Sequence, residues 1–210
     1  MSFQAVARRF VVLLSLAPLA FSPTASAVTI RPEQAGIGNF GQINESYYRG
    51  AQPNRDGFKR LGTLGIRTVI DLQEEPQAGE PGWVKESGMK YFNIPLSGSR
   101  PANHEQTARF LELVNDSTNW PVYVHCAAGR HRTGEMTGIY RITHDSWTAD
   151  RAYQEMQKYG YYSFPNHGSL KQYVYSYYDA YRVAKAPASD STLASAGPVA
   201  TNPPRAAMRP

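Results

Sequence analysis

The sequence predicts an α/β domain with a mostly parallel central sheet that is flanked by helices. Two kinds of segment alternate along the chain: short runs rich in β-branched and aromatic residues, and longer runs whose apolar residues recur at helical spacing. The run 68–72 (TVIDL) has the composition of a strand that is buried on both faces. Alternating strands and helices favour a parallel sheet, since each helix carries the chain back across one face.

Three more strands are predicted from runs of the same kind. Each run is short, carries β-branched or aromatic residues, and ends near glycine, proline or polar residues, which favour turns. The acidic segment 74–88 is rich in glycine and proline, so it is predicted as a loop with a short helix near Trp83. The three strands are 46–49 (SYYR), 90–95 (KYFNIP) and 121–124 (PVYV).

Five helices are predicted from apolar periodicity and from capping residues. The side chains of Asn54 and Thr148 can each accept a hydrogen bond from the first turn of the helix that follows. The apolar face of the second helix is expected to hold Ala108, Phe110, Leu111 and Val114. The five helices are predicted from 54 to about 62, over 105–115, over 133–143, from 148 to 159 and from about 169 to 183.

Residues 1–27 are predicted to be a secretory signal peptide. Arg8 and Arg9 form a charged start, residues 10–21 form an apolar run, and residues 25–27 (ASA) form a small-residue cleavage site. The apolar run is too short to cross a bilayer as a helix. We therefore expect an exported protein, periplasmic or secreted, with no stable membrane anchor after cleavage.

Residues 186–210 are predicted to be a disordered tail, because Ala, Pro, Ser and Thr dominate and little apolar surface is available for burial. The residues between the two termini, 28–185, are enough for one domain with a sizeable core. The chain carries 22 basic and 17 acidic side chains, and the basic Arg8 and Arg9 lie in the predicted signal peptide. The remaining excess is too small and too scattered to indicate a nucleic-acid partner.

The chain contains one cysteine, Cys126. Exported proteins often pair their cysteines in disulfides, and a single cysteine has no internal partner. Composition alone favours an inert buried thiol, because free cysteine is among the most buried residue types. The residues that surround Cys126 favour a reactive thiol instead.

Cys126 lies in the sequence HCAAGRHRT (125–133), between a predicted strand and a predicted helix. A tight loop that leads into a helix N-terminus directs several backbone N–H groups, and the positive end of the helix dipole, at one point. Such a loop suits a phosphate dianion, and Gly129 allows a backbone geometry that a side chain would obstruct. The expected phosphate-binding residues are Ala127, Ala128, Gly129, Arg130, His131 and Arg132.

Cys126 and Arg132 are the expected catalytic residues of this loop. The planar guanidinium of Arg132 can grip two phosphate oxygens at once, which a lysine does less well. The same positive surroundings are expected to lower the pKa of Cys126, so that a thiolate faces the bound phosphorus. The hydroxyl of Thr133 can hydrogen-bond the sulfur and help it to leave when water breaks the intermediate.

At these residues the chain resembles the cysteine-dependent protein-tyrosine and dual-specificity phosphatase superfamily, whose signature is HCx5R followed by serine or threonine. The segments YYRGAQP, GIRTVIDLQEE, NIPL, RTGEMTGIYRI and AYQEMQKYGY are similar to compact bacterial enzymes of the dual-specificity type, and the likeness covers 46–181. The resemblance implies that 28–185 is a phosphatase domain with a dual-specificity-phosphatase-like fold, a phosphomonoesterase with a phosphocysteine intermediate at Cys126. It also implies supporting roles for His125 and Thr133, and no metal or other cofactor.

Enzymes of this superfamily usually carry an aspartate, on a loop before the cysteine, that protonates the leaving oxygen. The corresponding loop 96–103 (LSGSRPAN) contains no carboxylate, and Ser99 stands where similar bacterial enzymes carry the acid. Glu105 and His104, just past the loop, are candidate general acids, although both also suit the exposed start of a helix. Alternatively, a carboxylate after Leu72 (Glu74, Glu75 or Glu80) supplies the proton, or the substrate has a leaving group that needs little protonation, such as a phosphoanhydride.

Arg130 and His131 add basic side chains inside the loop, as in similar enzymes that act on phosphoinositides and inositol pyrophosphates; Arg130 could equally point to solvent. The expected partner is a phosphorylated protein, with phosphotyrosine first, or a phosphorylated small molecule. A phosphate-binding pseudo-phosphatase is an alternative because the acid is missing, but a pure binder needs no nucleophile. Arsenate reductases normally need resolving cysteines and sulfurtransferases lack the His and the Arg-Thr-Gly around the cysteine, so both are disfavoured.

Overall fold

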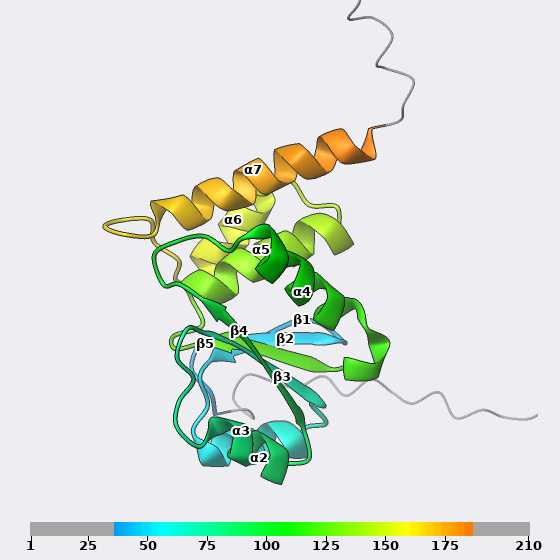
Figure 1. The fold of residues 1–210 in the computed structure, drawn as a ribbon, viewed down its shortest axis with the longest axis vertical. Coiled ribbons are helices and arrows are strands. Elements are labelled where there is room, and N and C mark those ends of the chain that lie inside the picture. Colours follow the sequence, from blue (N-terminus) through cyan, green and yellow to red (C-terminus); the bar gives the residue numbers. More distant parts are fainter. Residues whose placement is uncertain (1–35, 187–210) are drawn as a thin grey trace, which may run out of the picture.

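The computed structural model describes residues 36–186, and in this range a five-stranded sheet carries helices on both faces (Figure 1). The predicted α/β class and mostly parallel sheet are confirmed. The predicted signal peptide, residues 1–27, and residues 187–210 of the predicted tail lie outside the described range.

The strands lie in the order β1-β2-β5-β3-β4. Among the described strands β1 and β2 pair antiparallel, and all other neighbours are parallel. The four predicted strands are present, whereas β1 was not predicted, because its sequence GQIN contains a single β-branched residue. The bounds are Gly41–Asn44 for β1, Tyr47–Ala51 for β2, Thr68–Gln73 for β3, Lys90–Leu96 for β4 and Val122–Cys126 for β5.

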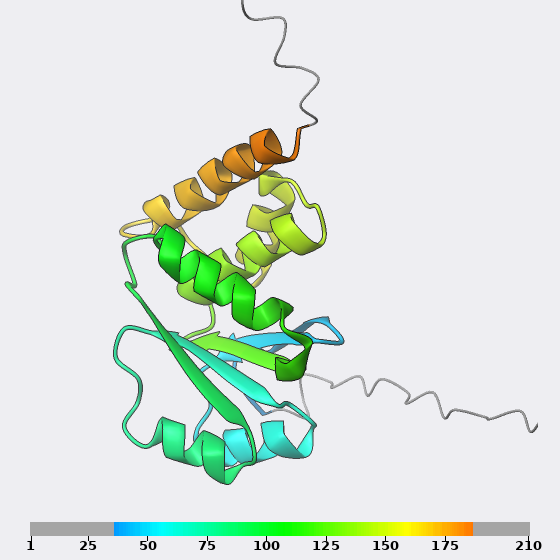
Figure 2. The ribbon, with the colours of Figure 1, turned by 45° about the vertical axis from the view of Figure 1, so that its right-hand side comes forward.

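Helices α2 and α3 cover one face of the sheet, α4 and α5 cover the other, and α6 and α7 pack on α5 (Figures 1 and 2). The predicted caps are confirmed: Asn54 accepts from the N–H of Gly57 at 2.8 Å, and Thr148 from that of Arg151 at 3.3 Å. No described helix is long and apolar enough to cross a membrane. The bounds are Arg55–Thr63 (α2), Glu80–Glu86 (α3), His104–Asn115 (α4), Ser117–Asn119 (η1, a 3-10 turn), His131–His144 (α5), Ala149–Lys158 (α6) and Gly168–Lys185 (α7).

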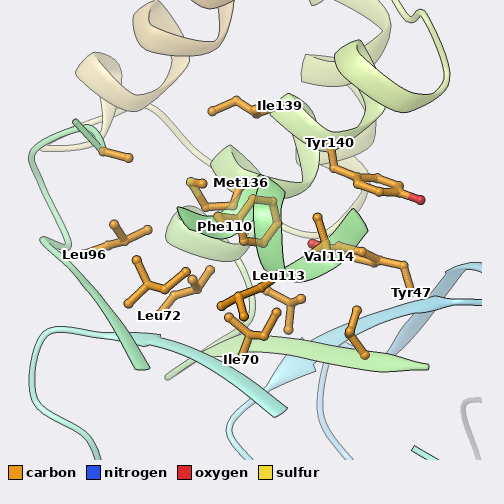
Figure 3. Packing of buried hydrophobic residues seen from close by; sticks show 14 of the residues in the cluster. Tyr47, Ile70, Leu72, Leu96, Phe110, Leu113, Val114, Met136, Ile139 and Tyr140 are labelled. Atoms are coloured by element: carbon orange, nitrogen blue, oxygen red, sulfur yellow. The ribbon is translucent and has the colours of Figure 1, made fainter. Parts of the chain in front are cut away.

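The largest apolar cluster fills the space between the sheet and helices α4 and α5 (Figure 3). Ile70 and Leu72 of β3 lie beneath Phe110 of α4 and Met136 of α5 in this view. A second cluster, under α2 and α3, covers the opposite face of the sheet. Burial on both faces holds the parallel strands in register, and their carboxyl ends therefore meet at one well-defined edge, where ligands bind in sheets of this kind.

The buried face of α4 differs from the predicted one. Ala108 is exposed and Leu111 is only half buried, whereas Thr107 and Leu113 are buried beside the correctly predicted Phe110 and Val114. A buried threonine is tolerated here because its hydroxyl hydrogen-bonds the phenol of Tyr173 at 2.7 Å. Apolar residues lie on two adjacent stripes of this helix, so periodicity alone did not decide between them.

We predict that Leu113→Ala lowers the free energy of unfolding by about 2–5 kcal/mol, because it leaves a cavity under α4. The matched change Leu111→Ala removes the same atoms from a half-buried position and is expected to cost clearly less. Urea denaturation of both variants measures the difference. Equal losses would show that the two leucines are buried alike.

Candidate active site

Cys126 is the last residue of β5, the strand that lies between β2 and β3 in the sheet. Residues 127–132, here called the phosphate loop, lead from this strand into α5, which begins at His131. The thiol is buried, with 3% of the residue exposed. The predicted order of strand, loop and helix is therefore present, and it places the sulfur in front of a helix N-terminus at the carboxyl edge of the sheet.

The phosphate loop turns back sharply at Gly129, which has a φ of +66°. A Cβ at this position would lie 2.4 Å from the carbonyl carbon and oxygen of Gly50 in β2. Both the left-handed conformation and the close approach of two backbones exclude other residues. Glycine is thus required for the shape of the loop, as the sequence predicted.

The carbonyl groups of the phosphate loop are held away from the thiol. The N–H of Gln52 donates to Ala127 O at 3.2 Å, and the Asn39 amide donates to Ala128 O at 3.3 Å and to Gly129 O at 2.9 Å. With its carbonyls bound on the outer side, the loop presents backbone N–H groups on its inner side. That polarity is what an anion needs.

Arg49 of β2 is the fully buried side chain behind the loop. Its Nη2 donates to Gly129 O at 2.6 Å, and the guanidinium lies 4.0 Å from the ring centroid of Tyr159. No role was predicted for Arg49 from the sequence, although it lies in the YYRGAQP segment that carries part of the resemblance. A charged residue within an otherwise apolar strand was the available signal.

Arg132 lies at the ends of two neighbouring strands. Its Nη1 is 3.5 Å from the carbonyl oxygen of Leu72 in β3 and 3.3 Å from that of Leu96 in β4. These carbonyls orient the guanidinium, and no described residue forms an ion pair with it. Its remaining N–H groups are therefore available for a ligand, as predicted for a phosphate-gripping arginine.

The surroundings of Cys126 favour the thiolate. Burial alone would raise the pKa of this thiol, but the hydroxyl and backbone N–H of Thr133, the charge of Arg132 and the N–H of Gly129 outweigh it and lower the pKa below the ordinary value. The lowered pKa matches the direction expected from the sequence. A buried thiolate in front of N–H donors is a nucleophile poised for an electrophilic phosphorus.

His125 is fully buried next to the thiol and contacts two carboxylates. Its Nε2 lies 2.9 Å from Oε1 of Glu80, whose other oxygen accepts from the Gln52 amide at 2.7 Å, and its Nδ1 lies 3.9 Å from Asp71. These side chains are of metal-ligating types. Asp71 already accepts from the N–H of Gln73 and from the Tyr91 hydroxyl, each at 2.9 Å, so its oxygens are engaged within β3 and by β4.

The carboxylates after Leu72 do not lie together. Glu80 is buried at the start of α3 and belongs to the support of His125. Glu74 and Glu75 are exposed, and Glu74 lies 4.0 Å from Arg100 of the β4–α4 loop, residues 97–103. Glu80 therefore contributes to positioning, a role that the sequence did not indicate.

The two proposed general acids of α4 are both exposed. His104 lines a surface hollow with Tyr173 and Tyr177 of α7, and no residue of the phosphate loop lines this hollow. Glu105 lies in the first turn of α4. Within the described residues, neither side chain forms a hydrogen bond or an ion pair with the phosphate loop.

The β4–α4 loop is instead tied to two other elements. His167 donates from Nδ1 to Gly98 O at 2.8 Å, and the Ser169 hydroxyl donates to Ser99 O at 2.8 Å, both from the segment that leads into α7. The His167 ring also stacks on that of His131 in the phosphate loop, with 3.6 Å between centroids and 20° between planes. The contact between these segments could not be predicted from the sequence, because Gly98 and His167 are 69 residues apart.

Glu135 is a buried carboxyl group in α5 that the sequence analysis did not single out. Its Oε1 accepts from the N–H of Ala102 in the β4–α4 loop at 2.9 Å, while Oε2 has no hydrogen-bond partner among the described residues. Burial raises its pKa to about 8, although the bond from Ala102 opposes the shift. At neutral pH Glu135 is thus mostly protonated and links α5 to this loop.

We predict that Glu135 makes stability depend on pH. The unfolded chain releases this proton near the ordinary pKa of 4.5 and the folded chain only near 8, so stability falls as pH rises between these values, by a few kcal/mol. Glu135→Gln keeps an acceptor for Ala102 and should flatten the decline, measured by denaturation from pH 4 to 9. The exposed control Glu105→Gln should leave it unchanged, and parallel curves for all three proteins would contradict the assignment.

A model of the tyrosine phosphatase family matches residues 36–194 of the chain. Among curated proteins, the chain is similar to the inositol diphosphatase DSP2 of Oryza sativa subsp. japonica, with 29% identity over 126 residues, 58% of this chain and 61% of that protein. It is also similar to the dual specificity protein phosphatase TpbA of Pseudomonas aeruginosa, with 26% identity over 123 residues, 59% of this chain and 55% of that protein. Each match thus spans less than two thirds of the relative.

Solved structures show the same likeness. The core catalytic domain of the PP-IP phosphatase SIW14 from S. cerevisiae has a TM-score of 0.60 at 25% identity, over 70% of this chain and 92% of that one. The crystal structure of P. aeruginosa TpbA has a TM-score of 0.61 at 25% identity, over 77% of this chain and 97% of that one. Since the family model matches more than half of the chain and the HCx5R loop has the expected geometry, the chain belongs to the tyrosine phosphatase family of cysteine-dependent phosphatases.

Proposed function

We propose that this protein is a phosphomonoesterase that uses the Cys126 thiolate as nucleophile. The observation that supports this most strongly is the phosphate loop itself: its carbonyls are bound on the outer side, and its inner side faces a thiol of lowered pKa. Curated relatives with a phosphatase name add to the argument. Binding alone would not need a nucleophile poised in this way, which disfavours the pseudo-phosphatase alternative.

In the proposed mechanism, backbone N–H groups and Arg132 hold the phosphate dianion against the sulfur. The thiolate attacks phosphorus, the bond to the leaving oxygen breaks, and a phosphocysteine forms. Water then attacks the same phosphorus, the S–P bond breaks, and inorganic phosphate leaves. The Thr133 hydroxyl stabilises the departing thiolate, which agrees with its effect on the pKa of Cys126.

The proposed substrate is a phosphorylated protein, with phosphotyrosine first. An aromatic side chain contacts the phosphate loop: the ring of Tyr162 meets that of His131 edge-on, with centroids 4.4 Å apart. Phe164, two residues further along the chain, is 86% exposed. Exposed aromatic rings suit an aromatic ester. We also propose that the protein acts outside the cytoplasm, a proposal that rests on the sequence of residues 1–27.

A second candidate substrate is a small molecule with several phosphate groups. Arg130 is exposed, but it packs beside Gly160 and, together with Lys158, lines a hollow at the phosphate loop. Two cations beside this loop would attract an additional phosphate group. Proteins named inositol diphosphatases are among the relatives, which is consistent with this candidate.

We predict that the purified protein hydrolyses p-nitrophenyl phosphate in the presence of EDTA and that Cys126→Ser abolishes the activity. Loss of the thiolate removes the nucleophile while the phosphate loop keeps its donors, so the variant should still bind inorganic phosphate or vanadate. His144→Gln, a change at the far end of α5, is the control and should keep full activity. Hydrolysis by Cys126→Ser, or phosphate binding without hydrolysis by the native protein, would overturn the proposal.

We predict that Arg130 and Lys158 affect kcat/KM only for a substrate with several phosphate groups. A phosphotyrosine peptide and an inositol pyrophosphate are compared by kcat/KM, first with the native protein and then with Arg130→Gln and Lys158→Gln. If phosphotyrosine is the substrate, the peptide is preferred and both variants retain at least about half of its kcat/KM, since the hollow carries no second phosphate. If polyphosphates are the substrate, the preference is reversed and each variant loses about tenfold, equal to about 1.4 kcal/mol.

A further inference from the structure

The β4–α4 loop lacks an acid that could protonate the leaving oxygen, and the candidates of α4 lie away from the phosphate loop. An alkyl or phenolic oxygen leaves poorly as an anion, and a positioned acid contributes about 10²- to 10⁴-fold to such reactions. One titratable side chain contacts both the β4–α4 loop and the phosphate loop. That side chain is His167, from the segment before α7.

The contacts of His167 define which nitrogen is free. A carbonyl oxygen can only accept, so the 2.8 Å contact between Nδ1 and Gly98 O requires the proton to be on Nδ1. No described residue hydrogen-bonds to Nε2. This nitrogen can therefore give a proton from the imidazolium form and take one up in the neutral form, which is the arrangement of a histidine acid and base.

The stack on His131 places this ring at the phosphate loop rather than elsewhere on the surface. The centroids of the two imidazoles are 3.6 Å apart, and the Tyr162 ring meets both of them edge-on, at 4.4 Å from His131 and 5.4 Å from His167. The Tyr161 hydroxyl donates to the backbone oxygen of His167. His167 is thus contacted from three sides, and it lies next to His131, the residue before Arg132.

The charges nearby keep His131 neutral. Burial first, and then the charges of His167, Arg130 and Arg132, lower the pKa of His131 to about 4, so His131 is neutral at neutral pH. The titratable and charged groups on the elements packed against His167 include His131, Arg130, Arg132 and Glu135 of the phosphate loop and α5, Arg100 of the β4–α4 loop, Tyr161 and Tyr162 of its own segment, and Lys171 and Tyr173 of α7.

We propose that His167 is the general acid that protonates the leaving oxygen, a role that rests on the proposed function of Cys126. The hydrogen bond to Gly98 attaches His167 to the β4–α4 loop, and the stack on His131 attaches it to the phosphate loop. The acid comes from a segment 41 residues after the nucleophile, instead of from the loop before it. A sequence motif that covers only the loop before the cysteine therefore does not include this acid.

The proton is conserved through the two steps. While the thiolate bonds to phosphorus and the bond to the leaving oxygen breaks, the proton on Nε2 passes to that oxygen, and His167 becomes neutral. Neutral His167 then accepts a proton from the water that attacks the phosphocysteine. The S–P bond breaks, the thiolate is restored, and His167 is again an imidazolium.

The test is His167→Gln, assayed on two aryl phosphates with different leaving groups. The glutamine amide can still donate to Gly98 O but carries no transferable proton. We expect kcat for phenyl phosphate, the poorer leaving group, to fall by about 10²-fold, and kcat for p-nitrophenyl phosphate by less than about tenfold. His144→Gln, a histidine change on α5 away from the loop, is the matched control and should alter neither rate.

The pH dependence of kcat separates a catalytic role of His167 from a purely structural one. With phenyl phosphate, the pH dependence of kcat in the native protein should include a limb that is absent in His167→Gln. The pKa of Glu135 is raised to about 8, so Glu135→Gln is the control and should retain that limb. Loss of the limb in Glu135→Gln but not in His167→Gln would overturn the assignment.

Failure of this proposal is distinguishable from failure of the proposed function. If Cys126→Ser is inactive but His167→Gln loses both substrates equally, or loses neither, only the role of His167 is wrong. If His104→Gln or Glu105→Gln alone produces the selective loss on phenyl phosphate, the acid lies on α4. If Cys126→Ser stays active, the nucleophile itself is wrong.

Discussion

The site depends on the outward orientation of the carbonyl groups in the phosphate loop. Asn39, Arg49 and the backbone of Gln52 bind these carbonyls from behind, and the N–H groups are left to face Cys126. A loop with mixed orientation would have opposed the thiolate and repelled a phosphate. The buried Arg49 guanidinium is stabilised by this hydrogen bond and by its contact with the Tyr159 ring, while its Nε and Nη1 have no hydrogen-bond partner among the described residues.

The charges around this loop are arranged in layers. Buried acids, Glu80 and Asp71, lie behind His125, while positive charge and N–H dipoles lie in front of the thiol. Burial keeps these acids out of contact with a bound anion. The same burial makes Glu135 retain its proton at neutral pH, and a neutral carboxyl group can brace the β4–α4 loop without adding negative charge.

Much of this protein was predictable because short-range patterns encode it. The β-branched run of β3, the caps Asn54 and Thr148 and the motif around Cys126 each depend on neighbours in the chain. The edge strand β1 and the buried face of α4 were not predicted correctly. Both depend on partners elsewhere, since β1 forms only against β2 and Thr107 is buried only because Tyr173 supplies a hydrogen bond.

The sequence by itself determined the nucleophile, the phosphate-binding loop and the family, because nine consecutive residues between a strand and a helix carry that chemistry. Only the tertiary structure determined which side chains from distant segments contact the phosphate loop. Arg49 and Glu80 reach it from other strands and helices, and His167 reaches it across a fold that brings α7 to the β4–α4 loop. Such contacts have no fixed spacing in the chain, so only packing reveals them.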